Sequence, residues 1–143
     1  MADTQEMRYT GFWARAGAAA LDLLVFMLIS VSLLYAIHGR GYFKSEVPDR
    51  GAVDFLNMFV LPNLMVPLLW FLCSATPGKM AMSSKVVDAR TGKKPTFRQC
   101  LIRLAGYYLS ALPFGLGFLW VALDRKKQGW HDKLAGTVVI RTR

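Results

Sequence analysis

The feature that most constrains this sequence is an apolar run from residue 16 to residue 37 that carries a single charge, Asp22. A helix over these 22 residues is about 33 Å long, which is enough to cross the hydrocarbon core of a bilayer. Arg15 immediately precedes the run and lies two helical turns before Asp22, so both side chains fall on one face of the helix. A carboxylate within a spanning helix costs about 2.5–3.5 kcal/mol on insertion scales. The run therefore predicts a spanning helix whose polar face is turned toward other helices.

Two interpretations of Arg15 and Asp22 are open at this point. In the first, the residues are structural, because Arg15 anchors the helix at the lipid head groups and neighbouring helices satisfy Asp22. In the second, they take part in transport, because ionisable residues within a membrane often mark ion pathways. Gly17 and the alanines around it make the first turns of the helix slim. Small side chains of this kind predict that another element approaches Asp22 closely.

The composition indicates a membrane protein. Of the 143 residues, 54% are hydrophobic and 19% are charged, against about 25% charged in soluble domains. The length predicts one domain over residues 1–143. The net charge is +9, but the basic residues lie beside the apolar runs, which is typical of membrane orientation and of binding to anionic lipid head groups. We therefore expect no nucleic-acid binding. The two cysteines, Cys73 and Cys100, have no metal-ligand spacing, so we expect no metal, cofactor or disulfide.

Two further apolar runs follow. The second span is expected at residues 55–73, which carry no charge, and the third run covers residues 104–123. In the second, Asn63 follows a proline that would kink the helix. Asn63 is either one polar contact packed in the kink or a group that reaches the first helix and lines a path. In the third, Pro113-Phe-Gly115 interrupts the helical pattern.

The distribution of lysine and arginine orients the chain. Residues 38–54 carry three, residues 74–103 carry seven and the tail at 124–143 carries six. The positive-inside rule therefore places the N-terminus and the segment 74–103 in the cytoplasm. A straight third span would put the basic tail outside, against the rule, whereas a broken or re-entrant element would return it to the cytoplasm. We favour the broken or re-entrant element, and a three-span arrangement is the alternative.

Short β-branched runs predict a small cytoplasmic β element. Residues 84–89 and 93–97 flank Gly92 and predict a hairpin, which the strand-like residues 137–141 would join. The expected fold class is thus an all-α membrane protein with two firm transmembrane helices, a third broken or re-entrant helical element and a small cytoplasmic β element.

Three parts of the sequence carry a resemblance to a known family. They are the arginine and aspartate of the first helix, the segment from Thr76-Pro-Gly-Lys79 to Gly92, and the tail Arg125-Lys-Lys-Gln-Gly-Trp-His131-Asp132-Lys-Leu-Ala-Gly-Thr137. With these the chain resembles the RDD family of small bacterial membrane proteins, named for an arginine and two aspartates, from about residue 9 to residue 140. The resemblance assigns Asp132 as the second aspartate, with Asp88 as the alternative. It implies an inner-membrane location and a role in transport, since some members resemble monovalent cation/proton antiporters.

Two function hypotheses follow. In the first, the protein is a component in the transport of an ion or small solute, with Asp22 binding a cation or proton and Arg15 competing for it. His131, beside Asp132, either relays protons or fixes the tail against the membrane. Two or three spans are few for a carrier, so we expect a homo-oligomer or a membrane-protein partner.

In the second hypothesis the protein is a non-catalytic scaffold or assembly factor. Arg15, Asp22 and Asp132 then form an internal polar cluster that links the first helix to the C-terminal element. Arg103 and Asn63 are accessory candidates in both hypotheses. We expect no enzyme activity, because the sequence has no nucleophile motif and only two histidines.

Overall fold

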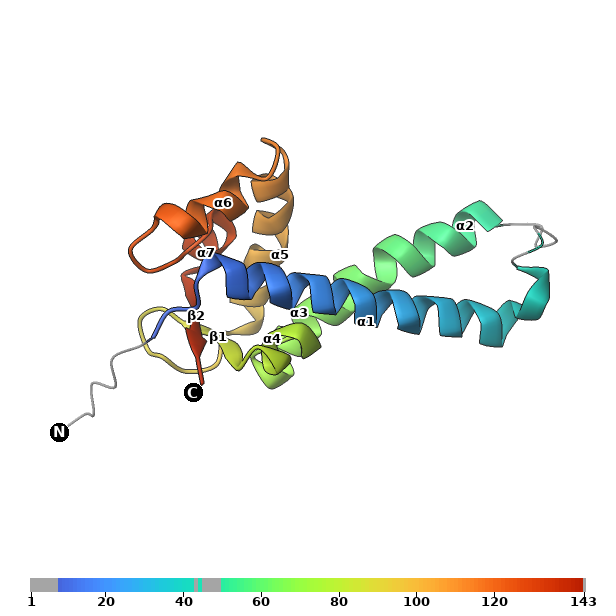
Figure 1. Ribbon diagram of the computed structural model, residues 1–143, viewed down its shortest axis with the longest axis horizontal. Helices are drawn as coiled ribbons and strands as arrows, with labels where there is room; N and C mark the ends of the chain where they lie inside the picture. Colours follow the sequence, from blue (N-terminus) through green and yellow to red (C-terminus); the bar gives the residue numbers. More distant parts are fainter. Residues whose placement is uncertain (1–7, 43, 45–49, 143) are drawn as a thin grey trace.

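Two long helices extend away from the end of the molecule at which the described part of the chain begins and ends (Figure 1). The computed structural model describes residues 8–42, 44 and 50–142. The first long helix is α1 (Phe12–His38). The second is continuous through α2 (Arg50–Phe55), a π-helical turn η2 (Leu56–Val60) and α3 (Leu61–Cys73). Both are long and apolar enough to cross a membrane, with mean hydropathies of 2.3 and 1.8. The two predicted spans are confirmed.

The end of α1 and the start of α2 lie at the far end of the molecule (Figure 1). Gly39, with φ of 60°, ends α1, and a short 3₁₀ turn η1 (Gly39–Gly41) follows. The segment 38–54, whose lysine and arginine residues were counted for the orientation, includes residues 45–49. Those residues lie outside the part of the chain that the structure describes.

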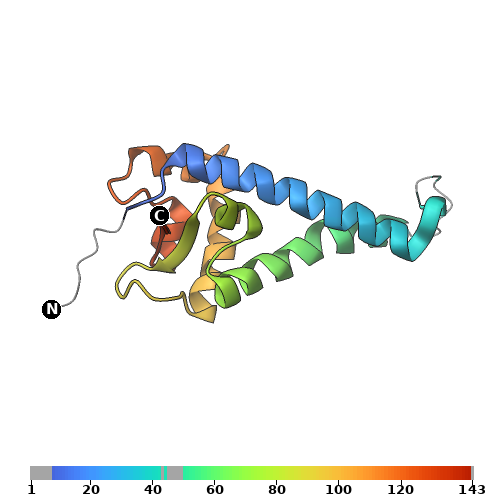
Figure 2. The ribbon, with the colours of Figure 1, turned by 60° about the horizontal axis from the view of Figure 1, so that its bottom comes forward.

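The third apolar run is broken, as predicted. It forms α5 (Phe97–Ala111) and α6 (Leu116–Leu123), whose axes meet at 101°. The break lies at Pro113-Phe-Gly115, where Phe114 and Gly115 both have positive φ. In both ribbon views α5 runs across the direction of α1 and α3, and does not lie alongside them as a third parallel span (Figures 1 and 2).

The remaining elements gather at the end of the molecule where the described part of the chain begins and ends. They are α4 (Pro77–Ala81), α7 (Trp130–Ala135) and a two-stranded antiparallel sheet of β1 (Ser84–Asp88) and β2 (Thr137–Arg141). Val86 pairs with Val139 at the centre of the sheet. The expected β element is therefore confirmed, but the predicted hairpin is wrong, because residues 93–97 form no strand. Instead Thr96 caps α5 through a capping box with Gln99.

A small core joins this sheet to the membrane helices. Trp70 of α3, Val86 of β1, Cys100 of α5 and Val139 of β2 are all buried and pack together. Elsewhere, large apolar side chains are exposed along α1, α3 and α6, which is the pattern of helices that face lipid. The fold thus consists of a lipid-exposed helix pair attached to a compact end of short elements.

Candidate functional site

The centre of the compact end is Asp132, whose side chain is fully buried. Arg15 Nη1 donates a hydrogen bond to Asp132 Oδ2 over 2.5 Å, and Arg103 Nη1 donates to Oδ1. The backbone N–H of Gly129, at the start of α7, also donates to Oδ2 over 3.1 Å. Three segments far apart in the sequence therefore meet at one carboxylate. We call Arg15, Arg103 and Asp132 the arginine–aspartate cluster.

Arg103 is almost as buried as the aspartate, at 1% exposure. Its guanidinium donates to Thr137 Oγ1 over 3.0 Å and to the Tyr107 hydroxyl over 3.5 Å. It also lies 4.9 Å from the centroid of the Trp70 ring, which suits the stacking preference of a guanidinium. Hydrogen bonds, an ion pair and a ring contact together compensate the burial of this charge.

His131 stacks on Tyr107 with the ring centroids 4.4 Å apart. Burial lowers the pKa of His131 well below its ordinary value of 6.5, and the charges of Arg103, Arg15 and Lys79 lower it further. His131 Nε2 also lies 3.5 Å from Asp132 Oδ1, but Arg15 and Arg103 already pair with that carboxylate, so the imidazole is neutral at physiological pH. This geometry supports a packing role for His131 more than a proton relay.

Asp22 meets α4 and lies apart from the arginine–aspartate cluster. Thr76 Oγ1 donates to Asp22 Oδ2 over 2.5 Å, and the backbone N–H of Gly78 donates to Oδ1 over 2.7 Å. The close approach depends on Gly78, since a Cβ there would lie 1.9 Å from the carbonyl oxygen of Ala18. Both oxygens of this intramembrane carboxylate are satisfied by the first turn of α4.

Lys79 was not among the residues singled out from the sequence. It follows Gly78 in α4 and is 8% exposed, and its ammonium lies 5.9 Å from the Trp70 ring centroid. Burial lowers the pKa of Lys79 below its ordinary value of 10.5; Tyr107 raises it, Arg103 lowers it, Asp22 raises it, and Arg15 lowers it. The sequence places Lys79 in the Thr76-Pro-Gly-Lys79 part of the family resemblance, but its burial results from the folding of α4 back onto α1.

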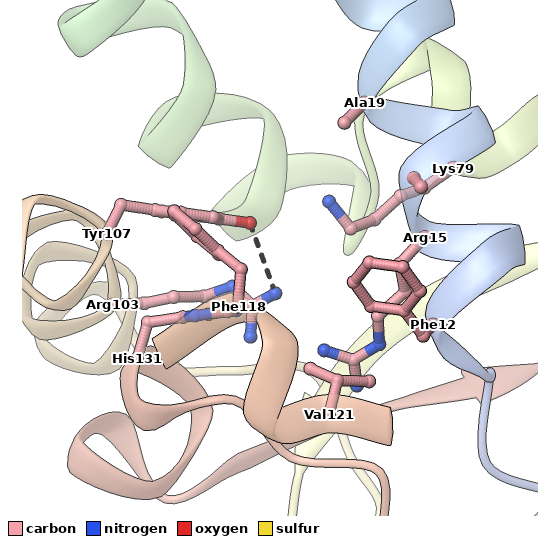
Figure 3. A pocket seen from close by; sticks show the side chains of 10 residues that line it. Phe12, Arg15, Ala19, Lys79, Arg103, Tyr107, Phe118, Val121 and His131 are labelled. Atoms are coloured by element: carbon pink, nitrogen blue, oxygen red, sulfur yellow. Dashed lines mark hydrogen bonds between the residues drawn. The ribbon is translucent and has the colours of Figure 1, made fainter. Parts of the chain in front are cut away.

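A cavity of about 350 Å³ adjoins the cluster. Figure 3 shows Lys79 and Arg15 pointing into it from one side, opposite Tyr107 and Arg103. The other lining residues are apolar or neutral: Phe12, Ala16, Ala19, Phe118, Val121 and His131. We call this space the cationic cavity, because its charged lining residues are all basic.

A second cavity of about 300 Å³ lies between α1, α3 and α5. Asp22 and Asn63 line it, and it shares Ala19, Lys79 and Tyr107 with the cationic cavity. Asn63 Nδ2 donates to the Phe59 carbonyl over 2.6 Å, and its Oδ1 accepts from Tyr108. Asn63 therefore bonds to α5 and not to the first helix, and it lines the cavity as well.

Asp88, the alternative second aspartate, lies elsewhere. It ends β1 and accepts hydrogen bonds from the backbone N–H of Arg90 over 2.7 Å and from Gln99 Nε2 over 3.0 Å. The geometry thus favours Asp132 as the partner of Arg15. Within the described part of the chain, no group of three or more His, Cys, Asp or Glu residues is placed to hold a metal ion.

Comparison with known proteins places this geometry in a family context. The sequence model of the RDD family matches residues 9–136. The uncharacterized protein RP437 of Rickettsia prowazekii is 37% identical over 102 residues, which is 71% of this chain but 56% of the relative, so the chain spans just over half of that protein. The uncharacterized membrane protein YteJ of Bacillus subtilis is 28% identical over 141 residues, covering 92% of this chain and 80% of the relative. No solved structure matches the chain.

Proposed function

The chain belongs to the RDD family, and from that premise we propose that it is a component in the transport of a small solute, which its cavities bind from the membrane. The observation that carries the proposal is that two neighbouring cavities share three lining residues, Ala19, Lys79 and Tyr107. One adjoins the arginine–aspartate cluster, and the other lies between the two spans. We propose that the three shared residues, which lie between the cavities, control the passage of solute from one to the other.

The charge of the lining favours a negatively charged solute. Arg15, Lys79 and Arg103 all line the cationic cavity. Cation/proton exchange at Asp22 is the competing form of the proposal. It requires that Asp22 first release Thr76 and Gly78, which occupy both of its oxygens. Anion binding requires no such rearrangement.

The proposal includes an assembly and an orientation. Two spans and a bent helix pair enclose little space, and many apolar side chains along α1 and α3 are exposed. A second copy of the chain or a membrane-protein partner would complete the path. The positive-inside rule supports an inner-membrane protein with the compact end in the cytoplasm. The basic surface at that end would bind anionic lipid head groups, and we propose no enzymatic activity.

A flux assay on purified protein in sealed vesicles tests the proposal. We expect the protein to accelerate the passage of phosphate or chloride, and Lys79→Met to abolish the acceleration. Lys93→Met is the matched control, since it removes one exposed lysine from the same end of the molecule. If the protein instead accelerates sodium/proton exchange, and Asp22→Asn abolishes this but Lys79→Met does not, cation exchange is supported. If the protein accelerates neither anion flux nor sodium/proton exchange, the transport proposal is contradicted.

A scaffold function is the second candidate. It is favoured by the arginine–aspartate cluster itself, in which Asp132 holds α1, α5 and α7 together. A scaffold predicts that replacing Asp132 destabilises the protein while the wild-type protein gives no flux. The same vesicle preparations therefore separate the two functions.

A further inference from the structure

The cationic cavity combines an excess of buried positive charge with an apolar wall. Arg15, Lys79 and Arg103 contribute three positive charges. In the described part of the chain, Asp132 pairs with the two arginines, and Asp22 influences Lys79 only from beyond ion-pair distance. Among the described residues, Lys79 has no carboxylate within ion-pair distance. Its cationic head rests near the Trp70 ring. Buried charges without partners are strongly unfavourable, so this arrangement is suited to receiving an anion.

Donor groups at the cavity are also unused. Arg15 Nη2 and Arg103 Nε are buried and have no hydrogen-bond partner. Lys79, at 8% exposure, points into the cavity from the side of α1 (Figure 3). Guanidinium and ammonium groups that converge in this way are the usual ligands of a phosphate group.

The rest of the cavity lining is suited to a hydrocarbon chain. Phe12 and Ala16 of α1 and Phe118 and Val121 of α6 contribute apolar side chains beside the cations. The volume of about 350 Å³ is near the lower end of the range for small-molecule sites. It accommodates a head group and the first part of a chain, and the rest of the chain would extend into the bilayer.

The depth of the cavity fits a lipid head group. The 27 residues of α1 span about 40 Å, which exceeds the roughly 30 Å of the hydrocarbon core. Arg15 lies in the first turn of α1, close to Phe12 and the exposed Trp13. Aromatic residues at the end of a spanning helix mark the head-group level.

We propose that the cationic cavity binds the phosphate head group of an acidic phospholipid through Arg15 and Lys79, with one acyl chain against α1 and α6. The proposal rests on the same cavity as the proposed transport function and names the class of its ligand. Binding in this cavity would be specific, unlike the general attraction of lipid head groups to the basic surface of the compact end.

Lipid binding to the purified full-length protein tests the inference. We would titrate phosphatidylglycerol, phosphatidylcholine with the same chains, and inorganic phosphate, and count bound ligand by native mass spectrometry in a zwitterionic detergent. We expect phosphatidylglycerol to bind at least tenfold more tightly than phosphatidylcholine. Lys79→Met should weaken that binding about tenfold, and Lys93→Met should leave it within about twofold.

A second pair of variants tests the apolar wall. Ala16→Phe fills the cavity from α1, whereas Ala20→Phe adds the same ring at an exposed position that does not line it. We expect Ala16→Phe to weaken phosphatidylglycerol binding and Ala20→Phe to leave it unchanged. If Lys79→Met fails to fold, this pair decides the question.

Three results would overturn the inference. They are equal binding of the two phospholipids, equal losses in Lys79→Met and Lys93→Met, and tight binding of inorganic phosphate without a preference for phosphatidylglycerol. The last result would identify a soluble phosphate as the ligand. Saturable phosphatidylglycerol binding without vesicle flux would support this inference and refute transport. Flux without a preference for phosphatidylglycerol would support transport and refute this inference.

Discussion

Replacing Asp132 by asparagine is expected to open the compact end of the molecule. The variant keeps the shape of the side chain and one acceptor oxygen but removes the negative charge. It leaves the guanidinium groups of Arg15 and Arg103 beside each other without a counter-charge. Asp132 is fully buried and Arg103 is 1% exposed, so water does not replace the lost partner.

The expected loss of stability in Asp132→Asn follows from that burial. Removing one partner of a buried ion pair destabilises a protein by about 3–5 kcal/mol. Arg15 keeps 11% exposure of its side chain, and the asparagine still accepts one hydrogen bond, so we expect a value near the lower limit, about 3 kcal/mol. This is a large part of the 5–15 kcal/mol or so that stabilises a typical domain.

Labelling of the Cys100 thiol measures how readily the compact end opens. This thiol is completely buried against Val86 of β1 and Val139 of β2, whereas Cys73 is exposed. In a Cys73→Ser background, a thiol reagent labels Cys100 only when this region opens. If opening is in rapid equilibrium, 3 kcal/mol corresponds to roughly 100-fold faster labelling in Asp132→Asn.

Asp124→Asn is the matched control. Asp124 pairs with Lys133 over 3.0 Å, but the lysine side chain is 44% exposed. A pair of this kind contributes at most about 1 kcal/mol, so Cys100 labelling should accelerate less than about fivefold. Wild-type labelling rates in Asp132→Asn, or equal acceleration in both variants, would refute the view that the arginine–aspartate cluster holds the compact end closed.

Three further predictions concern packing, pH and topology. Gly78→Ala should lower the melting temperature, with a loss of about 2 kcal/mol, because its Cβ would lie 1.9 Å from a backbone oxygen of α1; Gly51→Ala, which meets nothing within 4 Å, should not. Unfolding titrations should show stability falling as the pH drops below about 6.5. Burial and the neighbouring positive charges lower the pKa of folded His131, so the unfolded chain binds a proton that the folded chain does not, and His131→Asn should remove up to about 1.4 kcal/mol per pH unit of that slope. In cysteine-free protein in cells, a cysteine at Thr142 should be labelled only after the membrane is opened and one at Lys44 should be labelled from outside; the reverse pattern, or labelling of both from one side, would contradict the proposed orientation.

Hydropathy and turn chemistry were enough to predict the membrane part of the fold. The spans depend on composition over about 20 residues, which is read directly from the sequence. The break in the third run follows from Pro113 and Gly115, since proline ends the helical pattern and glycine accepts the positive φ found there. The local sequence is sufficient to predict the structure where local chemistry decides the backbone conformation.

The sheet shows where local reasoning fails. The hairpin prediction used the β-branched character of residues 84–89 and the turn at Gly92. In the structure, Asp88 accepts from the N–H of Arg90 and from Gln99, and so directs the chain into α5. The partner of β1 is β2, almost fifty residues later, so the predicted joining of residues 137–141 to this element is confirmed and only the hairpin partner at 93–97 is wrong. Non-local pairing is decided by tertiary packing, which overrides local β-propensity.

The candidate site was predicted only in part. Arg15 and Asp132 meet, but Asp22 binds α4, and Lys79 was not anticipated. The position of Lys79 depends on the close approach of α4 to α1 at Gly78, a single glycine in a segment that the sequence indicates only as a turn. The role of Gly78 depends on contacts between segments that are distant in the sequence, and the spacing of residue types along the sequence does not predict such contacts.

The arrangement of charges connects the architecture to the proposed ligand. Arg15 comes from the first helix, Arg103 from α5 and Asp132 from α7, so the cluster is complete only when the last helix has packed against the first. One carboxylate between two arginines closes the fold, but among the described residues no carboxylate that lines the cationic cavity lies within ion-pair distance of the Lys79 ammonium. A second carboxylate at this point would compensate that charge and remove the reason for an anion to bind. The chain instead places Phe12 and Phe118 beside the cations, and this combination of charge and apolar surface is what a phospholipid head group and chain require.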